Sequence, residues 1–145
     1  MKITVHENPT ATETEISITC AEVTESIQEL IASISLLGES FAGVRNEETF
    51  FVPMKDIFYF ESVDGKSFFY TKSDTYEAAE KLYQIEGKLR NRKFARVSKN
   101  AIVNLKKMQS IKKAENSRLV ATLTNGEKLL VSRKYVSEIR KKLGV

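Results

Sequence analysis

Cysteine, histidine and tryptophan are almost missing from this chain. Its 145 residues include one cysteine, Cys20, one histidine, His6, and no tryptophan. One cysteine excludes an internal disulfide, and together with one histidine it leaves too few ligands for a zinc site. His6 lies close to the first residue, where we expect no ordered site in which it could act as a catalytic base. We therefore expect no metal and no cofactor.

Glycine-rich and long apolar stretches are absent too. The six glycines never gather into a phosphate-binding loop, so neither a P-loop nor a dinucleotide fold is supported. The stretch Ser110–Lys113 fits the S-x-x-K pattern, but its companion motifs are missing. No apolar run approaches the roughly 20 residues that cross a bilayer, and Met1–Thr4 opens in strand-like sequence rather than a signal peptide. We expect a cytoplasmic protein that is not an enzyme and has no small-molecule substrate.

Charge is divided unequally along the chain. Residues 1–50 contain two basic residues and nine glutamates, a net charge of −7, whereas residues 51–145 contain 21 basic and 10 acidic residues, a net charge of +11. A basic body suits nucleic acid, and an acidic segment is repelled from it. We therefore divide the chain into an acidic segment, 1–40, for packing, dimerisation or regulation, and a basic domain, 41–145.

The acidic segment has the pattern of two strands and a helix. Strands are predicted at Ile3–His6 and Glu13–Cys20, on either side of a loop. A helix follows, because Thr19 and Glu22 have capping-box spacing and Gly38 is placed to end it. Its apolar stripe consists of Val23, Ile27, Leu30, Ile34 and Leu37. This stripe packs either on the sheet of its own chain or on a second copy as a dimer seam.

Short strands dominate from Phe41 onward. Turns at Asn46-Glu47, Asp64-Gly65 and Asn125-Gly126 predict three antiparallel hairpins, and the two-residue form of Asp64-Gly65 suits a type I′ turn. The flanking strands are predicted at Phe41–Arg45 with Thr49–Val52, Ile57–Val63 with Ser67–Thr71, and Arg118–Thr124 with Lys128–Val131. The fold class is therefore mainly β with α (α+β), with an antiparallel β body.

Two helices accompany these strands. Asp74 and Glu77 can cap a helix that extends to Arg92, with an apolar face formed by Ala78, Leu82, Ile85 and Leu89. A shorter helix near the C-terminus has Ser132 as its N-cap and buries Val136, Ile139 and Leu143. Because the first of these helices is followed by strands, a helix-turn-helix has no recognition pair. We therefore expect loops and strand ends to meet a partner.

A strip of one charge sign runs through the basic domain. From Gly87 to Lys113 the chain has ten basic residues and no acidic one. Such a strip attracts polyanions and can release counterions from nucleic-acid phosphates, although a solvated, solubilising surface would have the same composition. At its centre, Phe94–Leu105 joins a cationic, polar half to an apolar half. This pattern is expected when one end is anchored in a core and the other is presented to a partner.

Two turns offer side chains suited to nucleic acid. The Asp64-Gly65 turn is expected to expose Lys66 and Ser67 at a hairpin tip; the alternative is a merely solvated turn. In the central stretch, Lys99 can donate to guanine or to phosphate, and Asn100 matches the paired donor and acceptor of adenine. The alternative there is a strand edge protected by charge.

The start of the C-terminal helix is a third such place. Arg133 and Lys134 lie in its first turn, where cations oppose the helix dipole at a cost of roughly a few tenths of a kcal/mol each. Free N–H groups at such a helix start favour anions. These two cations are therefore best explained by a nearby phosphate or base edge.

At these residues the sequence resembles the LytTR-type DNA-binding domain of bacterial transcription regulators. The match rests on Asp56–Ser62, Phe94–Leu105 and Leu130–Tyr135. The resemblance implies an elongated β-β-β body with one inserted helix and a short C-terminal helix, preceded here by the strand-helix segment. It also implies that connecting segments enter successive major grooves of double-stranded DNA, often as two protomers on repeated half-sites.

The resemblance also assigns residues to DNA. The implied contacts are Ser67, Ser98, Lys99, Asn100 and Arg133, with Lys66, Arg96 and Lys134 as flanking contacts. Many members have His-Arg-Ser or His-Asn-Ser where this chain has Ser98, Lys99 and Asn100. Because Lys99 is a flexible point charge rather than a planar fork, its preferred base should differ from theirs.

The acidic segment departs from the commonest family arrangement. Many members carry a receiver domain there, whose phosphorylation needs aspartates, but the first aspartate of this chain is Asp56. The segment is instead similar to that of short stand-alone members. For these the resemblance implies control by protein level or by a membrane-bound inhibitor.

We predict a sequence-specific, double-stranded-DNA-binding transcription regulator that binds as a homodimer. One alternative is a β-rich RNA-binding module, because the aromatic runs Phe58–Phe60 and Phe68–Tyr70 could stack bases if exposed. With few polar residues between them, these runs are better suited to a core. Another alternative is a protein-interaction module that uses the acidic helix.

Overall fold

The computed structural model describes residues 1–12, 14–90 and 92–145, and their side chains except those of residues 35–38. Glu13 and the side chain of Leu37, which entered the predictions for the acidic segment, therefore lie outside the described residues and side chains. The helix of that segment continues through Gly38 to Glu39, so the prediction that Gly38 ends it is wrong.

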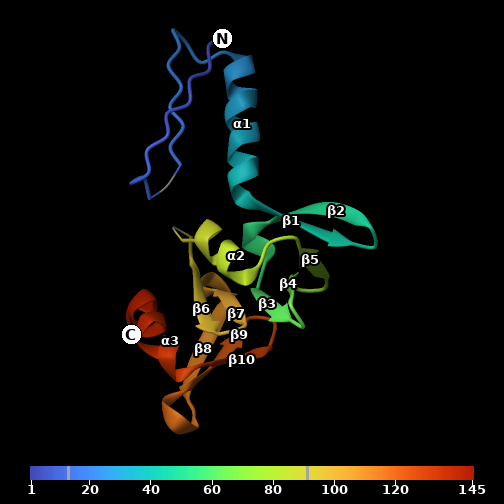
Figure 1. Cartoon of the computed structure of the whole chain (residues 1–145), viewed down its shortest axis with the longest axis vertical. Coiled ribbons are helices and arrows are strands. Elements are labelled where there is room, and N and C mark those ends of the chain that lie inside the picture. The colour runs from blue at the N-terminus through green and yellow to red at the C-terminus, as the bar shows by residue number, and fades with distance from the viewer. Residues whose placement is uncertain (13, 91) are drawn as a thin grey trace.

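Two antiparallel sheets form the body (Figure 1). The larger sheet has the strand order β2-β1-β5-β4-β3-β7-β6, and the smaller sheet has the order β10-β9-β8. The strands are β1 (Ser40–Arg45), β2 (Glu48–Pro53), β3 (Tyr59–Val63), β4 (Lys66–Tyr70), β5 (Thr75–Ala78), β6 (Phe94–Ser98), β7 (Ala101–Asn104), β8 (Met108–Lys113), β9 (Leu119–Leu123) and β10 (Lys128–Val131). The helices are α1 (Glu25–Glu39), α2 (Leu82–Lys88) and α3 (Arg133–Leu143). The predicted fold class, mainly β with α, is confirmed.

Alternate residues of the larger sheet face two separate hydrophobic cores. In β3, Phe60 packs into a first core that includes α2, while Tyr59 packs into a second core with the smaller sheet and α3. In β7, Ile102 joins the first core and Val103 the second. Because successive side chains of a strand point to opposite faces, β3 and β7 are held from both sides.

The aromatic runs belong to these cores. Phe58, Tyr59, Phe60 and Phe69 are buried, and Phe68 and Tyr70 are half-buried. A base-stacking platform needs exposed rings. These runs do not supply one in the free protein.

The predicted hairpins form at the predicted turns. Asn46 and Glu47 have φ values of 51° and 65°, and Asp64 and Gly65 have 50° and 79°. Two consecutive residues with positive φ match the twist of the flanking strands. The third hairpin joins β9 to β10 with Gly126 at a φ of 88°. Local turn chemistry therefore sets the register of three strand pairs.

The helix predicted from Asp74 to Arg92 is shorter than expected, because its first part is a strand. In β5, Tyr76 and Ala78 are buried while Thr75 and Glu77 are exposed, which is the period-two pattern of a strand. Asp74 forms an ion pair with Arg45 instead of capping a helix. Of the predicted apolar face, Leu82 and Ile85 on α2 and Leu89 at its C-cap are buried as expected, whereas Ala78 is buried as part of β5.

The acidic segment differs most from expectation. No strand forms at residues 1–12 or 14–39, so the strand predicted at Ile3–His6 is not present, and residues 14–20 of the one predicted at Glu13–Cys20 are not a strand either. The N-cap of α1 is Thr24, whose Oγ1 accepts from the Ile27 N–H at 3.4 Å, rather than Thr19. Val23 therefore precedes the helix. In Figure 1, α1 projects beyond one end of the body, beside the extended N-terminal segment.

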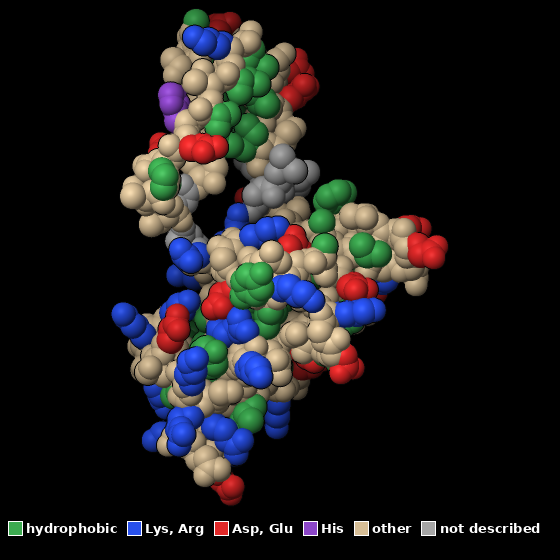
Figure 2. Space-filling view, viewed as in Figure 1, with side chains coloured by type: hydrophobic (Ala, Val, Ile, Leu, Met, Phe, Trp, Pro, Cys, Tyr) green, Lys and Arg blue, Asp and Glu red, His purple; other side chains and the backbone are tan. Residues whose placement is uncertain are grey.

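The apolar stripe of α1 does not cover the sheet of its own chain. Ile27, Leu30 and Ile34 of the stripe are only half-buried, and Ile31, which lies beside them on the helix, is 44% exposed. Figure 2 shows hydrophobic side chains exposed on this part of the molecule. Packing on the protein's own sheet, which the stripe could have indicated, is therefore not realised. No helix within the described ranges is long and apolar enough to cross a membrane.

Candidate nucleic-acid interface

Two backbone hydrogen bonds bring together the three predicted contact places. The Ser62 N–H at the end of β3 donates to the Asn100 carbonyl at 2.8 Å. The Ser132 N–H, just before α3, donates to the Val97 carbonyl at 2.8 Å. The β3–β4 hairpin and the start of α3 are thus both fixed to the β6–β7 hairpin. Because Ser62 and Asn100 are 38 residues apart and Val97 and Ser132 are 35 residues apart, segments remote in sequence become one surface.

The central turn, Lys99-Asn100, joins β6 to β7. An irregular register between Arg96 and Ser98 places a bulge directly before it, and bulges commonly redirect side chains. The Ser98 Oγ accepts from the Asn100 N–H at 3.2 Å and so shapes the turn. Lys99 and Asn100 are exposed, and their side chains have no hydrogen-bond or ion-pair partner among the described residues. Both can therefore meet a ligand without breaking an internal contact.

The first turn, Asp64-Gly65, presents one of its two predicted contacts. Lys66 is exposed, as predicted. Ser67 is only 3% exposed, so the prediction that it lies at the surface of the hairpin tip is wrong. The physical reason is that β4 already begins at Lys66, and alternation turns the next side chain inward, between Ser62 and Ala78.

The helix start, Arg133-Lys134, lies next to the central turn through the bond from Ser132. Ser132 is the N-cap residue, as predicted, but its hydroxyl makes no capping hydrogen bond. Arg133 and Lys134 are exposed, and the Lys134 Nζ lies 5.5 Å from the centroid of the Tyr135 ring. The first turn of α3 contains no acidic residue. An anion here would meet two cations and the positive end of a helix.

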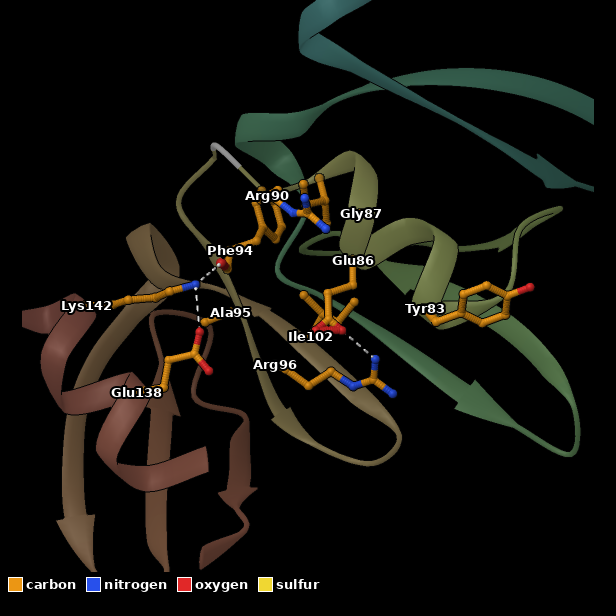
Figure 3. Close-up of a pocket in the computed structure, with 11 residues that line it drawn as sticks. Tyr83, Glu86, Gly87, Arg90, Phe94, Ala95, Arg96, Ile102, Glu138 and Lys142 are labelled. Atoms are coloured by element: carbon orange, nitrogen blue, oxygen red, sulfur yellow. Dashed lines mark hydrogen bonds and ion pairs between the residues drawn. The ribbon is translucent and has the colours of Figure 1, made fainter. Parts of the chain in front are cut away.

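Arg96 occupies a different position from the one expected for a flanking DNA contact. Its side chain is only 16% exposed. The Nε donates to the Ser98 carbonyl at 2.9 Å, and the Nη2 donates to the Lys99 carbonyl at 2.5 Å. The Nη1 donates to the Glu86 carboxylate at 2.9 Å (Figure 3). The guanidinium is therefore committed to the protein itself, and it holds the central turn.

The sequence did not indicate a role for two residues of this region. Glu86, on α2, receives the Arg96 guanidinium, and Lys81, just before α2, donates from Nζ to the Gly65 carbonyl at 2.7 Å. Lys81 reaches a turn that is remote in sequence, and Glu86 reaches a side chain of β6. No spacing rule links Lys81 to a turn 16 residues earlier. The contacts arise only once the sheet is assembled.

Electrostatics distinguish the body from the acidic segment. In Figure 2, lysine and arginine side chains gather over the body, around the sheets and α3, and few lie on the N-terminal part. Behind this surface, burial raises the pKa of Tyr59, and the nearby Glu127 and Glu61 carboxylates raise it further. Burial likewise raises the pKa of Tyr70, whose ring stacks on Tyr59 with centroids 4.5 Å apart. Burial in the second core and the two nearby carboxylates therefore disfavour ionisation of these phenols.

The body is thus a β-rich domain that presents basic turns and a basic helix start on one surface. The family model described as LytTr DNA-binding domain matches residues 47–144. A solved structure is similar with a TM-score of 0.70 and 26% identity, covering 74% of this chain and 98% of that chain. It is the LytTr DNA-binding domain of a Bacillus cereus protein described as a methyl-accepting/DNA response regulator. The chain belongs to the LytTR DNA-binding domain family.

Curated relatives fall into two groups. The sensory transduction protein LytT of Enterococcus faecalis is 31% identical over 103 residues, 70% of this chain and 43% of that protein. LytT of Bacillus anthracis is 33% identical over 99 residues, 68% of this chain and 40% of that protein. The chain thus spans about two fifths of the LytT proteins. An uncharacterized HTH-type transcriptional regulator of Staphylococcus aureus is 23% identical over 147 residues, 100% of this chain and 99% of that protein.

Proposed function

We propose that this protein is a sequence-specific regulator of transcription that binds double-stranded DNA in the bacterial cytoplasm. The observation that carries the proposal is the convergence of the central turn, the first turn and the helix start through two backbone hydrogen bonds of 2.8 Å. Each place presents a polar or cationic side chain with no fixed partner among the described residues, apart from the ring contact of Lys134. Because the chain belongs to a DNA-binding family, DNA is the proposed ligand of this surface.

The three places are assigned different tasks. Lys99 and Asn100 stand at the tip of a hairpin, a shape that the roughly 12 Å wide major groove admits, and they contact base edges there. Arg133 and Lys134 contact the phosphates or base edge of the next groove, at the positive end of α3. Lys66, directly after the first turn, contacts a phosphate of the DNA backbone. Ser98 shapes the central turn and adds a hydroxyl at its edge, whereas Ser67 and Arg96 are not direct contacts.

The test is selection of bound duplexes from a random library at near-physiological salt, with sequencing of the bound fraction. The proposal expects a motif, repeated about one helical turn apart if two copies bind. Competition with structured RNA and single-stranded DNA is the matched control for the RNA-binding alternative. Absence of any enriched duplex, with binding that disappears as salt rises, would contradict the proposal and leave only a basic surface.

We further propose that residues 1–40 join two copies of this chain. In α1, Glu25 and Glu29 lie on the side opposite Ile27, Ile31 and Ile34, so two stripes can meet without opposing their acidic groups. The described part of the segment before α1 is extended but belongs to no sheet. Because two isolated strands are barely stable in water, pairing with the same segment of a second copy would stabilise it. Ile27→Asp with Ile31→Asp should give a monomer in sedimentation that keeps the body folded. A monomeric native protein at all concentrations would contradict the dimer, and an integral membrane protein recovered by pull-down would favour an inhibitor on this surface.

A further inference from the structure

The short helix α2 and its N-cap residue are linked through side chains to two of the turns that we propose contact DNA. At its start, the Lys81 Nζ donates to the Gly65 carbonyl of the first turn at 2.7 Å. Further along, the Glu86 carboxylate accepts from Arg96 at 2.9 Å. Arg96 in turn donates to the carbonyls of Ser98 and Lys99 at 2.9 Å and 2.5 Å. One rigid element is therefore linked to the backbone of both turns.

We infer that α2 is a brace that fixes the position of the first turn relative to the central turn, and that Lys81, Glu86 and Arg96 are positioning residues. This inference rests on the proposed function, since it concerns how the same surface keeps its shape. The position of α2 is itself fixed by packing, because Leu82 and Ile85 are buried in the first core. Lys81 ends directly on a backbone carbonyl, and Glu86 acts through Arg96, whose guanidinium ends on two backbone carbonyls. Such contacts fix the path of a turn whatever side chains the turn carries.

The chemistry of Arg96 suits this task. A guanidinium is planar and presents several N–H groups in a fixed fork. Here the fork spans two successive carbonyls and a carboxylate at once, which an ammonium group cannot do in one plane. Arg96 also leaves the strand at the bulge before the turn, so its side chain runs alongside the segment it holds. Figure 3 shows the guanidinium directed toward Glu86 across the space between α2 and the β6–β7 hairpin.

Glu86 provides a test in which simple electrostatics and the brace predict opposite results. Its side chain is about half exposed, near a surface that meets a polyanion. Removing an acidic group from such a surface should raise affinity for every DNA sequence. If Glu86 instead orients Arg96, its removal loosens the central turn. Affinity for the selected motif should then fall relative to random DNA.

The experiment compares Glu86→Ala with Glu80→Ala by fluorescence anisotropy on the selected motif and on random duplex. Glu80 is the matched control, because it precedes the same helix and pairs with Lys88 at 2.5 Å, and it has no link to any of the three turns within the described part of the chain. We expect Glu86→Ala to lower the motif-to-random affinity ratio by about threefold to tenfold, and Glu80→Ala to leave it unchanged. An unchanged ratio for Glu86→Ala, with tighter binding to both duplexes, would refute its positioning role.

Arg96→Gln extends the test, with Arg96→Lys as the conservative variant. The brace predicts a loss of selectivity with an unchanged salt slope, partly restored by lysine, which can still reach one carbonyl. Equal losses on both duplexes, with a salt slope lower by about one unit, would make Arg96 a phosphate contact and overturn the inference. Lys81→Ala against Lys88→Ala repeats the comparison at the first turn, each removing one exposed lysine.

A readout in the free protein separates this inference from the proposed function. Hydrogen exchange followed by NMR should show faster exchange at the Asn100 amide in Glu86→Ala and Arg96→Gln, with little change in the melting temperature. If no DNA motif is ever selected, the proposed function fails, but this exchange experiment still decides the brace. Unchanged exchange at Asn100 in both variants would refute the brace even if sequence-specific binding is established.

Discussion

Lys99→Ala is the most direct test of sequence reading at the central turn. The Lys99 side chain is exposed and has no hydrogen-bond or ion-pair partner within the described ranges, so its removal should change folding stability by less than about 0.5 kcal/mol. Arg96 and Ser98 hold the turn through backbone atoms, which the substitution leaves in place. Any loss of binding can therefore be assigned to the missing ammonium group.

The expected size of that loss depends on what the ammonium group contacts. A base contact should weaken binding to the selected motif by about 1 to 3 kcal/mol, or about 5-fold to 150-fold, and relax the preference at one position. A phosphate contact should instead weaken binding to all duplexes and lower the salt slope by about 0.9. Anisotropy titrations on motif and random duplexes, between about 50 and 200 mM salt, distinguish the two.

Lys55→Ala is a suitable control for Lys99→Ala. Lys55 is exposed and lies two residues before Ile57, whose carbonyl accepts from the Asn104 side chain at 2.8 Å. It is therefore close to the end of β7 opposite the central turn. The control removes the same charge far from the tip and should leave the motif preference intact. Equal losses on motif and random DNA for Lys99→Ala would refute base reading by this residue.

Three further substitutions test the scaffold. Ile102→Ala should lower the free energy of unfolding by about 2 to 5 kcal/mol in urea titrations, because the side chain is fully buried in the first core, and an unchanged midpoint would contradict that placement. Gly43→Ala should cost at least about 1 to 3 kcal/mol, because an added Cβ would overlap the Phe69 ring; a neutral result would mean that β1 can move away. Because the pKa of Tyr59 is higher in the folded than in the unfolded protein, its contribution to folding stability is complete below about pH 10 and is lost as the pH rises further. Tyr59→Phe should therefore lose less folding stability than the native protein above about pH 10, as measured by urea titrations at increasing pH.

Features that depend on neighbouring residues were predictable from the sequence, and features that depend on assembly were not. The Asp64-Gly65 turn needs two residues with positive φ, which its sequence already provides. The stretch from Asp74 to Ala78 was ambiguous, because an acidic residue before mixed polar and apolar positions fits a helix start as well as a strand. Pairing with β4 and β1 decides in favour of the strand.

The candidate site shows the same division. The exposure of Lys99, Asn100, Arg133 and Lys134 agrees with expectation, because residues at turns and helix starts face solvent. The role of Arg96 could not be read from sequence, where it is one more cation in a basic strip. Its meaning depends on Glu86, ten residues away and on another element. The inward orientation of Ser67 depends on where β4 begins, to within one residue.

The burial of β3 and β7 on both faces bears on how this domain can change during evolution. The residues that hold the hairpins are Phe60, Ile102 and their alternating neighbours, whereas the tip residues Lys99 and Asn100 give no side-chain support to the described fold. Substitutions at the tip can therefore accumulate, because they do not destabilise the fold and selection for stability does not remove them. A lineage could acquire a new target site by changing two exposed side chains while inheriting the same scaffold.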